Sequence, residues 1–271
     1  MDDFPEVPLR VRGFAFIELA SSTQGVLGRT FEALGFVKVG MRRSGEAALY
    51  RHGGMTFLVN GNPDSMDVCF LTGHVLPVTA LAIRVEDAQA SFSRALELGA
   101  EPMDSEMGPL GLRVPPLQGV AAVPLYLVDD DTNLACFYDD PGFPADAGRH
   151  DAGGGSIAID HVAYSVYGGR LSYWASLHER LFGAGALRCL DLDTAGAEGI
   201  RHIALRTGMP GAAFDALRAA GIPLLVAPPN GSQPGDTSCL RLRMAAGCLT
   251  VEFNGHAPGS SEQRAFACAF A

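Results

Sequence analysis

Three residues in the second half of the sequence have side chains that bind transition metals, and each lies in its own strand-like segment. His161 lies in segment 157–166, His202 in segment 199–206 and Glu252 in segment 249–254. A lone histidine in a strand is more often a hydrogen-bonded core residue than a ligand. Two imidazoles and one carboxylate from three strands, however, make the ligand set of an open non-haem metal site. The sequence therefore predicts a metal centre at His161, His202 and Glu252.

The segments that would position these residues follow a plan that recurs along the chain. Runs rich in branched and aromatic residues predict strands, and an apolar spacing of three and four residues that stops at a glycine predicts helices. In the first half, the strands are expected at 14–19, 37–41, 47–51, 55–59, 78–85, around 112–114 and at 124–128, and the helices at 26–34 and 88–98. The repeating unit is one strand, one helix and up to three strands.

The second half repeats the first. Five identical pairs lie 122 positions apart: Ala82/Ala204, Arg84/Arg206, Ala90/Ala212, Phe92/Phe214 and Gly99/Gly221. This register places His202 opposite Ala80, and the pairs Glu32/Glu179 and Leu34/Leu181 place His161 opposite Phe14. A stretch rich in Gly, Pro, Ala and Asp at 139–156 is typical of a linker. We therefore predict an N-terminal metal-free domain at 1–148 and a C-terminal metal-binding catalytic domain at 149–271.

Several motifs resemble those of the vicinal oxygen chelate superfamily and, more closely, of the 4-hydroxyphenylpyruvate dioxygenase family. They are F-E-A-L-G-F-V-K-V-G and R-V-E-D-A-Q-A-S-F-S-R-A-L-E-L-G-A-E-P in the first half, and I-D-H-V, Y-G-G-R, W-A-S-L-H-E-R-L-F and G-I-R-H-I-A-L in the second. The resemblance implies an α+β fold of two domains built from repeated βαβββ modules. It also implies that His161, His202 and Glu252 hold Fe(II), and that Phe266 and Phe270 of a final helix cover the pocket.

The second half departs from the family pattern, and the departures bear on the substrate. The family has two further strands between segment 187–193 and Gly199, so the C-terminal domain is expected to be truncated. The family has glutamine beside the second histidine, where this chain has Arg201. It has glutamine, phenylalanine and another aromatic where this chain has Arg241, Arg243 and Thr250. These arginines suit a substrate with an extra carboxylate or phosphate, because guanidinium pairs with such groups bidentately. The alternative is that they are solvated strand residues.

The predicted function is an iron(II) dioxygenase that acts on a small 2-oxo acid with dioxygen, by oxidative decarboxylation and hydroxylation. One alternative is a redox-neutral lyase or isomerase that uses Mn or Mg on an anionic substrate. The other is a non-catalytic binding protein on the same scaffold. A net charge of −10 argues against nucleic acid, and the chain has neither a membrane span nor a signal-peptide pattern, which favours a cytoplasmic protein. A homodimer that covers the exposed sheet edge is compatible with the truncation.

Three further side chains have expected positions. Strand alternation places Asp160 on the face opposite to that of its neighbour His161. His178 lies on a helical pattern and is expected at the surface, whereas Trp174 occupies an apolar helical position and is expected in the core.

Overall fold

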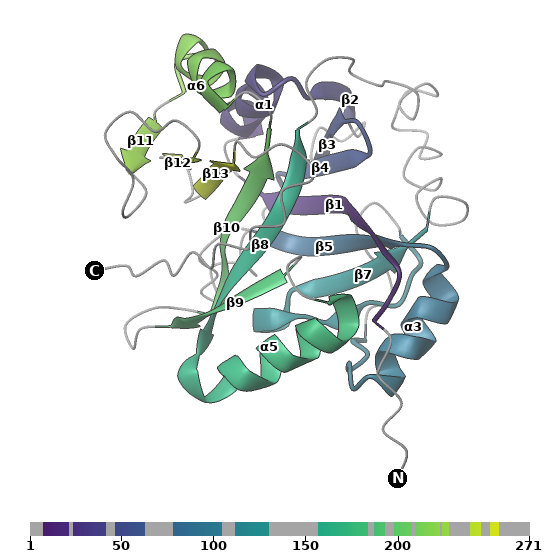
Figure 1. Cartoon of the computed structure of the whole chain (residues 1–271). Coiled ribbons are helices and arrows are strands. Elements are labelled where there is room, and N and C mark those ends of the chain that lie inside the picture. Colours follow the sequence, from purple (N-terminus) through teal and green to yellow (C-terminus); the bar gives the residue numbers. More distant parts are fainter. Residues whose placement is uncertain are drawn as a thin grey trace.

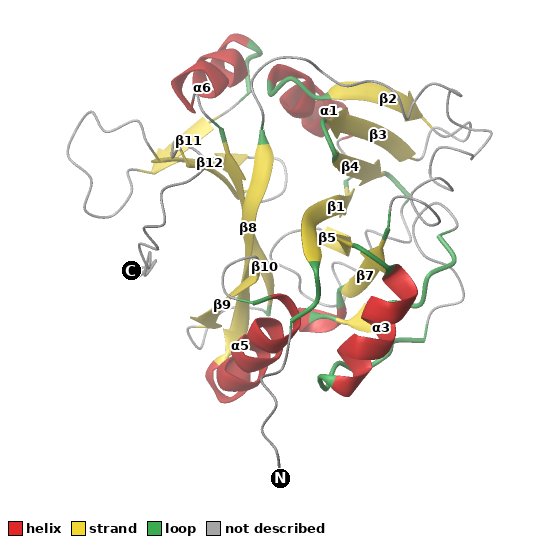
Figure 2. Cartoon of the chain, turned by 45° about the vertical axis from the view of Figure 1, so that its right-hand side comes forward, coloured by secondary structure: helices red, strands yellow, loops and turns green. Residues whose placement is uncertain are grey.

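Two mixed β-sheets, one from each half of the chain, form the framework, and the helices lie above and below them in the views of Figure 1 and Figure 2. The computed structural model describes residues 8–21, 24–41, 47–62, 78–104, 112–129, 157–183, 187–192, 198–207, 210–222, 224–227, 239–244 and 250–254. The fold is α+β, as predicted. None of the described helices is both long and apolar enough to span a bilayer.

The first sheet has seven strands in the order β2-β3-β4-β1-β5-β7-β6. Its two units meet where β1 (Val11–Ala20) pairs antiparallel with β5 (Val78–Val85). The first unit continues with α1 (Gln24–Ala33), β2 (Val37–Met41), β3 (Ala47–His52) and β4 (Met55–Asn60), which gives the predicted βαβββ order. The second continues with α3 (Ala88–Glu97), β6 (Leu117–Gln118), the 3-10 helix η2 (Val120–Ala122) and β7 (Pro124–Val128).

The second sheet has six strands in the order β11-β12-β13-β10-β8-β9. Its units meet where β8 (Ala158–Tyr167) pairs antiparallel with β10 (Gly199–Arg206), and these two long strands lie side by side in Figure 1. The unit that begins with β8 continues with α5 (Gly168–Phe182) and β9 (Leu187–Leu192). The unit that begins with β10 continues with α6 (Pro210–Ala219), β11 (Leu224–Ala227), β12 (Cys239–Met244) and β13 (Thr250–Asn254).

The unit that begins with β8 is shorter than its counterpart in the first half. Among the described residues a single strand, β9, follows α5, whereas three strands follow α1. Only residues 193–197 separate the described residues of β9 from Glu198, which directly precedes β10. The predicted truncation of the C-terminal half is therefore confirmed. The predicted domain boundary lies among residues 130–156, outside the described part, and remains a prediction.

Three of the helices are followed by a glycine, and two of them, α1 and α3, end there as the sequence predicts. Gly35, Gly99 and Gly221 follow α1, α3 and α6, and their φ angles of 84°, 94° and 68° lie in the left-handed region that closes a helix without steric cost only for glycine. At its other end, α3 is capped by Asp87, whose carboxylate accepts a hydrogen bond from the Ala90 amide at 2.8 Å. Such a cap satisfies an amide that has no partner within the helix.

One predicted strand is wrong. Residues 112–116 form no strand, and the short strand β6 begins only at Leu117. Pro115 and Pro116 have no amide hydrogen to donate to a neighbouring strand, which excludes them from the interior of a sheet. Leu112 still contributes to the core, with 1% of its surface exposed.

The prediction that His178 lies at the surface is also wrong. Its side chain is buried in α5, 4% exposed, with ring centroids 5.5 Å from Tyr164, 5.8 Å from Trp174 and 6.2 Å from Phe182. Trp174 is 3% exposed, as predicted for a core position.

Each sheet has two distinct faces. A large apolar core joins the two halves and includes Ile17, Ile83, Val162, Tyr164 and Leu205. A second cluster lies on the other face of the first sheet: Ala15, Phe16, Val39, Ala47, Leu49, Leu58, Ala80, Ala82, Leu112, Tyr126 and Val128. In the second sheet, the corresponding face is the one that carries the candidate metal ligands.

Candidate metal centre

The backbone pairing aligns two of the three predicted ligands across neighbouring strands. His161 on β8 pairs with Ala204 on β10, and Ala204 pairs with Glu252 on β13. Paired residues lie on the same face of a sheet, so His161 and Glu252 flank Ala204, each about 5 Å away in strand spacing. Alanine has a single methyl group and leaves space above it. The row therefore places His161 and Glu252 on either side of a position with a small side chain.

The third predicted ligand lies on the central strand of this row. His202 is two residues from Ala204 on β10 and pairs with Ala163 on β8. Positions two apart on a strand share a face, so His202 lies on the same face as the row. The side chains of His202 and Glu252 lie outside the described part of the structure, and among the described side chains no three potential ligands gather. The convergence of the three side chains therefore remains a prediction.

The first sheet contains an equivalent row whose side chains are described. Phe16 pairs with Ala82 and Ala82 pairs with Tyr126, a register equivalent to His161–Ala204–Glu252. The rings of Phe16 and Tyr126 meet above the alanine, with centroids 6.2 Å apart, and are 1% and 2% exposed. Side chains at the two ends of this row thus converge over the central alanine.

The register corrects one alignment made from the sequence. His161 corresponds to Phe16, not to Phe14, because each pairs with the equivalent alanine, Ala204 or Ala82. His202 corresponds to Ala80, as predicted. Phe16, Ala80 and Tyr126 thus occupy the three equivalent positions in the first half, where two aromatic rings and a methyl group stand in place of the two histidines and the glutamate.

The ring of His161 is held by its sequence neighbour. The His161 Nδ1 atom lies 2.8 Å from Asp160 Oδ2, and the side chains are 7% and 26% exposed. The expectation that Asp160 faces the other side of the strand is therefore wrong. The pairing of β8 with β10 shifts between Ile159 and His161, so strand alternation does not apply to Asp160. Sequence reasoning missed this residue because a shift in register leaves no clear signal in a single sequence.

The predicted substrate-binding residues have register positions but no described side chains. Arg241 pairs with Glu252, and Arg243 pairs with Thr250, so these four positions share the face of the metal row. Arg201 falls at a second register shift, between Ile200 and His202. Phe266 and Phe270 lie outside the described residues.

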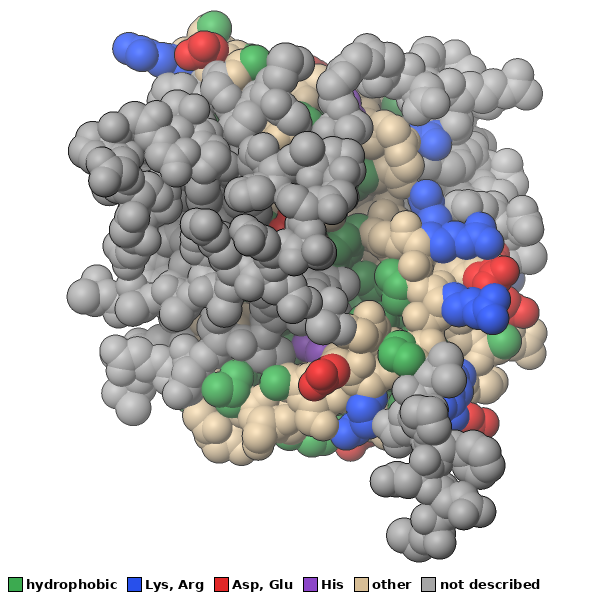
Figure 3. All heavy atoms as spheres, viewed as in Figure 1, with side chains coloured by type: hydrophobic (Ala, Val, Ile, Leu, Met, Phe, Trp, Pro, Cys, Tyr) green, Lys and Arg blue, Asp and Glu red, His purple; other side chains and the backbone are tan. Residues whose placement is uncertain are grey.

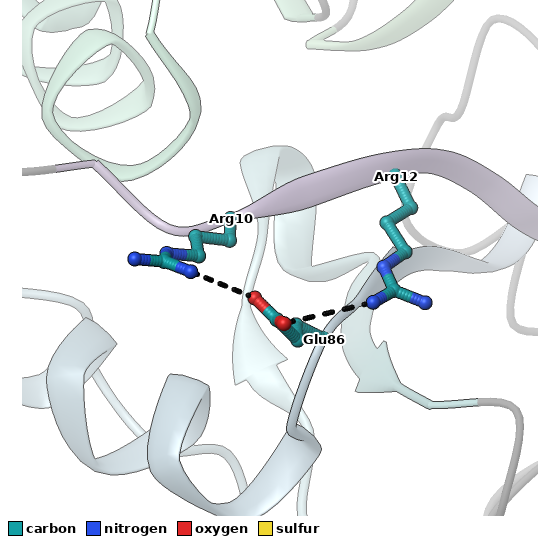
Figure 4. Close-up of polar contacts among 3 residues, drawn as sticks. All are labelled: Arg10, Arg12 and Glu86. Atoms are coloured by element: carbon teal, nitrogen blue, oxygen red, sulfur yellow. Dashed lines mark hydrogen bonds and ion pairs between the residues drawn. The ribbon is translucent and has the colours of Figure 1, made fainter.

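A groove elsewhere on the described surface contains none of these residues. It has a volume of about 480 Å³ and is lined by Pro8, Leu9, Arg10, Glu86, Asp87, Ala90, Ser91 and Arg94. Glu86 is shared by Arg10 at 3.2 Å and Arg12 at 3.7 Å (Figure 4). Acidic and basic side chains lie next to one another on the right-hand side of the molecule in Figure 3. Exposed ion pairs of this kind contribute little to the stability of the fold, and they do not define a catalytic site.

Two buried ionisable side chains lie away from the metal row. Burial lowers the pKa of His178 from its ordinary value near 6.5 to about 4, because the surrounding rings cannot solvate an imidazolium. Burial also raises the pKa of Glu18, against the opposing effect of hydrogen bonds that Thr79 and Asn60 donate to its carboxylate.

Comparison with known proteins identifies the class of the fold. Residues 5–141 match the family model described as "Hydroxyphenylpyruvate dioxygenase, HPPD, N-terminal", which is half of the chain. The chain therefore belongs to the 4-hydroxyphenylpyruvate dioxygenase family, as the motifs indicated, and is a shortened member of it.

Individual relatives extend this match into the second half. The chain is 41% identical over 191 residues to a 4-hydroxyphenylpyruvate dioxygenase of Pseudomonas sp., covering 70% of this chain and 54% of the relative. It is 32% identical over 176 residues to a 3-dehydroshikimate dehydratase of Pseudomonas putida, covering 64% of this chain and 27% of the relative. This chain thus spans about half the length of the dioxygenase relative, and less of the dehydratase.

A solved structure shares the fold across nearly the whole chain. It is a fusion of a xylose isomerase-like TIM barrel with a 4-hydroxyphenylpyruvate dioxygenase. The TM-score is 0.71 at 22% sequence identity, and the match covers 96% of this chain and 51% of that chain. The likeness shows that the second half, which the family model does not reach, adopts the family fold as well.

Proposed function

We propose that this chain binds Fe(II) through His161, His202 and Glu252 and catalyses an oxygen-dependent reaction on a 2-oxo acid. The observation that carries the proposal is the pairing of His161 and Glu252 with the same alanine, Ala204. Family membership supports it, because the chain matches a relative named 4-hydroxyphenylpyruvate dioxygenase over most of its own length.

The donor set fits ferrous iron. Two imidazole nitrogens and one carboxylate are the facial ligands of non-haem iron oxygenases, and they leave the other positions open. His161, His202 and Glu252 would hold the iron, which would supply the chemistry for the reaction of dioxygen with a 2-oxo acid. The net reaction would release CO₂ and place both oxygen atoms in the remaining product, so no separate reductant would be needed. The burial of His161 supports a site from which water is largely excluded.

The arginines would give this site its preference for an anion. Arg241 and Arg243 lie on β12 beside β13, at positions that share the face of Glu252. Arg201 occupies the register shift that corresponds to Thr79 in the first half, where the Thr79 hydroxyl reaches Glu18 at 2.8 Å on that face. Guanidinium groups at these positions would bind a substrate carboxylate or phosphate in pairs of hydrogen bonds. Thr250, Phe266 and Phe270 would complete the proposed substrate pocket.

A redox-neutral lyase that uses Mn or Mg at the same ligands is the second candidate. The similarity to a relative named 3-dehydroshikimate dehydratase favours it, together with the arginines, which suit an anionic substrate. A divalent ion at this site would then polarise a carbonyl group without oxygen chemistry.

Oxygen consumption separates the two functions. The protein is loaded anaerobically with ferrous iron, mixed with 4-hydroxyphenylpyruvate or another 2-oxo acid, and followed with an oxygen electrode. Oxygen uptake by the Glu252→Ala variant is measured in parallel as a control. Uptake by Arg241→Leu is measured with substrates that have a second anionic group and with substrates that lack one. Uptake that requires both iron and Glu252 is the expected result. A tightly bound metal without oxygen uptake on any 2-oxo acid would reject the dioxygenase in favour of the lyase.

A further inference from the structure

We propose that Asp160 is a positioning residue whose carboxylate fixes the tautomer and the ring orientation of His161, so that Nε2 is the atom that binds the metal. The inference rests on the proposed metal site and makes no assumption about the substrate.

The contact determines which nitrogen carries the proton. An ionised carboxylate only accepts hydrogen bonds, so at 2.8 Å the Nδ1–H group of His161 donates to Asp160 Oδ2. In a neutral imidazole, the other nitrogen then carries the lone pair. A metal-binding histidine commonly donates its second ring N–H to a carboxylate, which fixes the ring and makes it a stronger ligand.

A shift in the pairing of β8 with β10 makes this contact between sequence neighbours possible. In a regular strand, adjacent side chains point to opposite faces. Here Ile159 pairs with Leu205 and His161 with Ala204, which leaves Asp160 as an extra residue between them. Ile159 and Val162 consequently both join the large core, and Asp160 and His161 both lean to the opposite face. Such bulges redirect side chains and occur often beside active sites.

The same shift in the first half carries no polar pair. Phe14 pairs with Ile83 and Phe16 with Ala82, which leaves Ala15 as the extra residue. Ala15 and Phe16 lie together in one apolar cluster, each 1% exposed. The fold therefore accommodates this shift with two apolar side chains and does not need a carboxylate and an imidazole there. The Asp160–His161 pair is better explained by a function of the second half.

The experiment measures metal binding and the histidine tautomer separately. Cobalt(II) replaces iron, and its visible absorption gives the dissociation constant for the full-length wild type and for Asp160→Ala and Asp160→Asn. Asp215→Asn, on the exposed part of α6, is the control for the loss of one carboxylate. In metal-free protein with ¹⁵N-labelled histidine, NMR identifies the tautomer of His161, whose signals are assigned by their absence in His161→Asn.

We expect cobalt affinity to fall on the order of 10- to 100-fold in Asp160→Ala. The cobalt affinity of Asp160→Asn should lie between those of wild type and Asp160→Ala, because its amide oxygen still accepts a hydrogen bond but has no charge. Asp215→Asn should bind cobalt like wild type. In wild type, the NMR signals of His161 should show the tautomer with its proton on Nδ1. In Asp160→Ala, a fraction of the molecules should carry the proton on Nε2 instead. If Asp160→Ala does not fold, Asp160→Asn carries both measurements.

Two results would overturn the inference, and they differ in what they leave intact. Unchanged cobalt affinity in the folded Asp160 variants, with wild-type binding that depends on Glu252, would reject the positioning role and leave the metal site standing. Absence of Glu252-dependent cobalt binding in the wild type would reject the metal site, and the positioning role with it.

Discussion

Protonation of His178 should destabilise the protein at mildly acidic pH. The imidazole is 4% exposed and surrounded by Tyr164, Trp174 and Phe182. Its pKa falls to about 4 in the folded chain because burial disfavours the charged form. Between that value and the ordinary value near 6.5, the unfolded chain binds more protons than the folded chain. The stability that depends on a neutral His178 should therefore be fully present at neutral pH. The free energy of unfolding should fall as the pH falls through this window.

The size of the loss follows from the shift. One pKa unit corresponds to about 1.4 kcal/mol, so the complete effect is about 3 kcal/mol. Between about pH 7 and about pH 5, the part lost is about 2 kcal/mol. This is a large fraction of the stability of a typical protein, which is about 5–15 kcal/mol.

Trp174 provides the assay, because it is the chain's single tryptophan and lies 5.8 Å from the His178 ring. Urea unfolding followed by its fluorescence, in the presence of a chelator, gives the free energy of unfolding at each pH. His178→Phe keeps an aromatic ring in the core and removes the titration. Its stability should therefore fall by about 2 kcal/mol less than that of wild type between about pH 7 and about pH 5. The control is Glu179→Gln, an exposed neighbour on α5, which should retain the wild-type pH dependence.

Equal losses in wild type and His178→Phe would refute this reasoning. That result would mean that the buried imidazole is protonated as easily in the folded chain as in the unfolded one.

Two further changes test the sheets themselves. Glu18 is buried in β1, and burial raises its pKa, so the ionised carboxylate is less favourable in the folded chain than in the unfolded one. As the pH rises through that pKa, the free energy of unfolding of wild type should therefore fall relative to that of Glu18→Gln. Urea unfolding across a pH series measures this, and parallel curves for the two proteins would contradict it. Ala204→Val should weaken cobalt binding on the order of tenfold or more, because it fills the space between His161 and Glu252. Its counterpart Ala82→Val should lower the melting temperature but leave cobalt affinity unchanged, and equal affinity in both variants would argue against the site.

Local sequence signals predicted the regular elements well. The bounds of β2, β5 and β7 agree with the sequence pattern, because each is rich in branched or aromatic residues and is followed directly by a charged residue: Arg42, Glu86 or Asp129. The strand expected around 112–114 was wrong, and its error is also explained by local sequence. Its apolar residues gave a strand pattern, but the two prolines that follow determined where pairing begins.

The alignment of the two halves was less predictable, because the strand and the helix do not share one offset. Glu32 and Glu179 match along the helices, and that spacing placed His161 opposite Phe14. Sixteen residues separate Phe16 from Glu32 and eighteen separate His161 from Glu179, so the offset is 145 along the strands and 147 along the helices. Only the hydrogen-bonded register identifies Phe16 as the counterpart of His161.

Asp160 could not be predicted for a related reason. Strand alternation is a local rule and depends on unbroken pairing with the neighbouring strand. The extra residue in β8 breaks it at this one position, and the sequence I-D-H-V gives no sign of the break. The residue types at the site were therefore readable from the sequence, whereas the contact that orients one of them was not.

The comparison of the two halves explains why one scaffold serves both a core and a candidate metal site. In each sheet an alanine, Ala82 or Ala204, lies at the centre of a row and leaves space above it. Phe16 and Tyr126 fill that space in the first half with two rings, which makes it part of the core. His161 and Glu252 occupy the same two positions in the second half, where an imidazole and a carboxylate would leave space between them above the alanine. A metal ion is the group that would both fill it and satisfy these polar side chains.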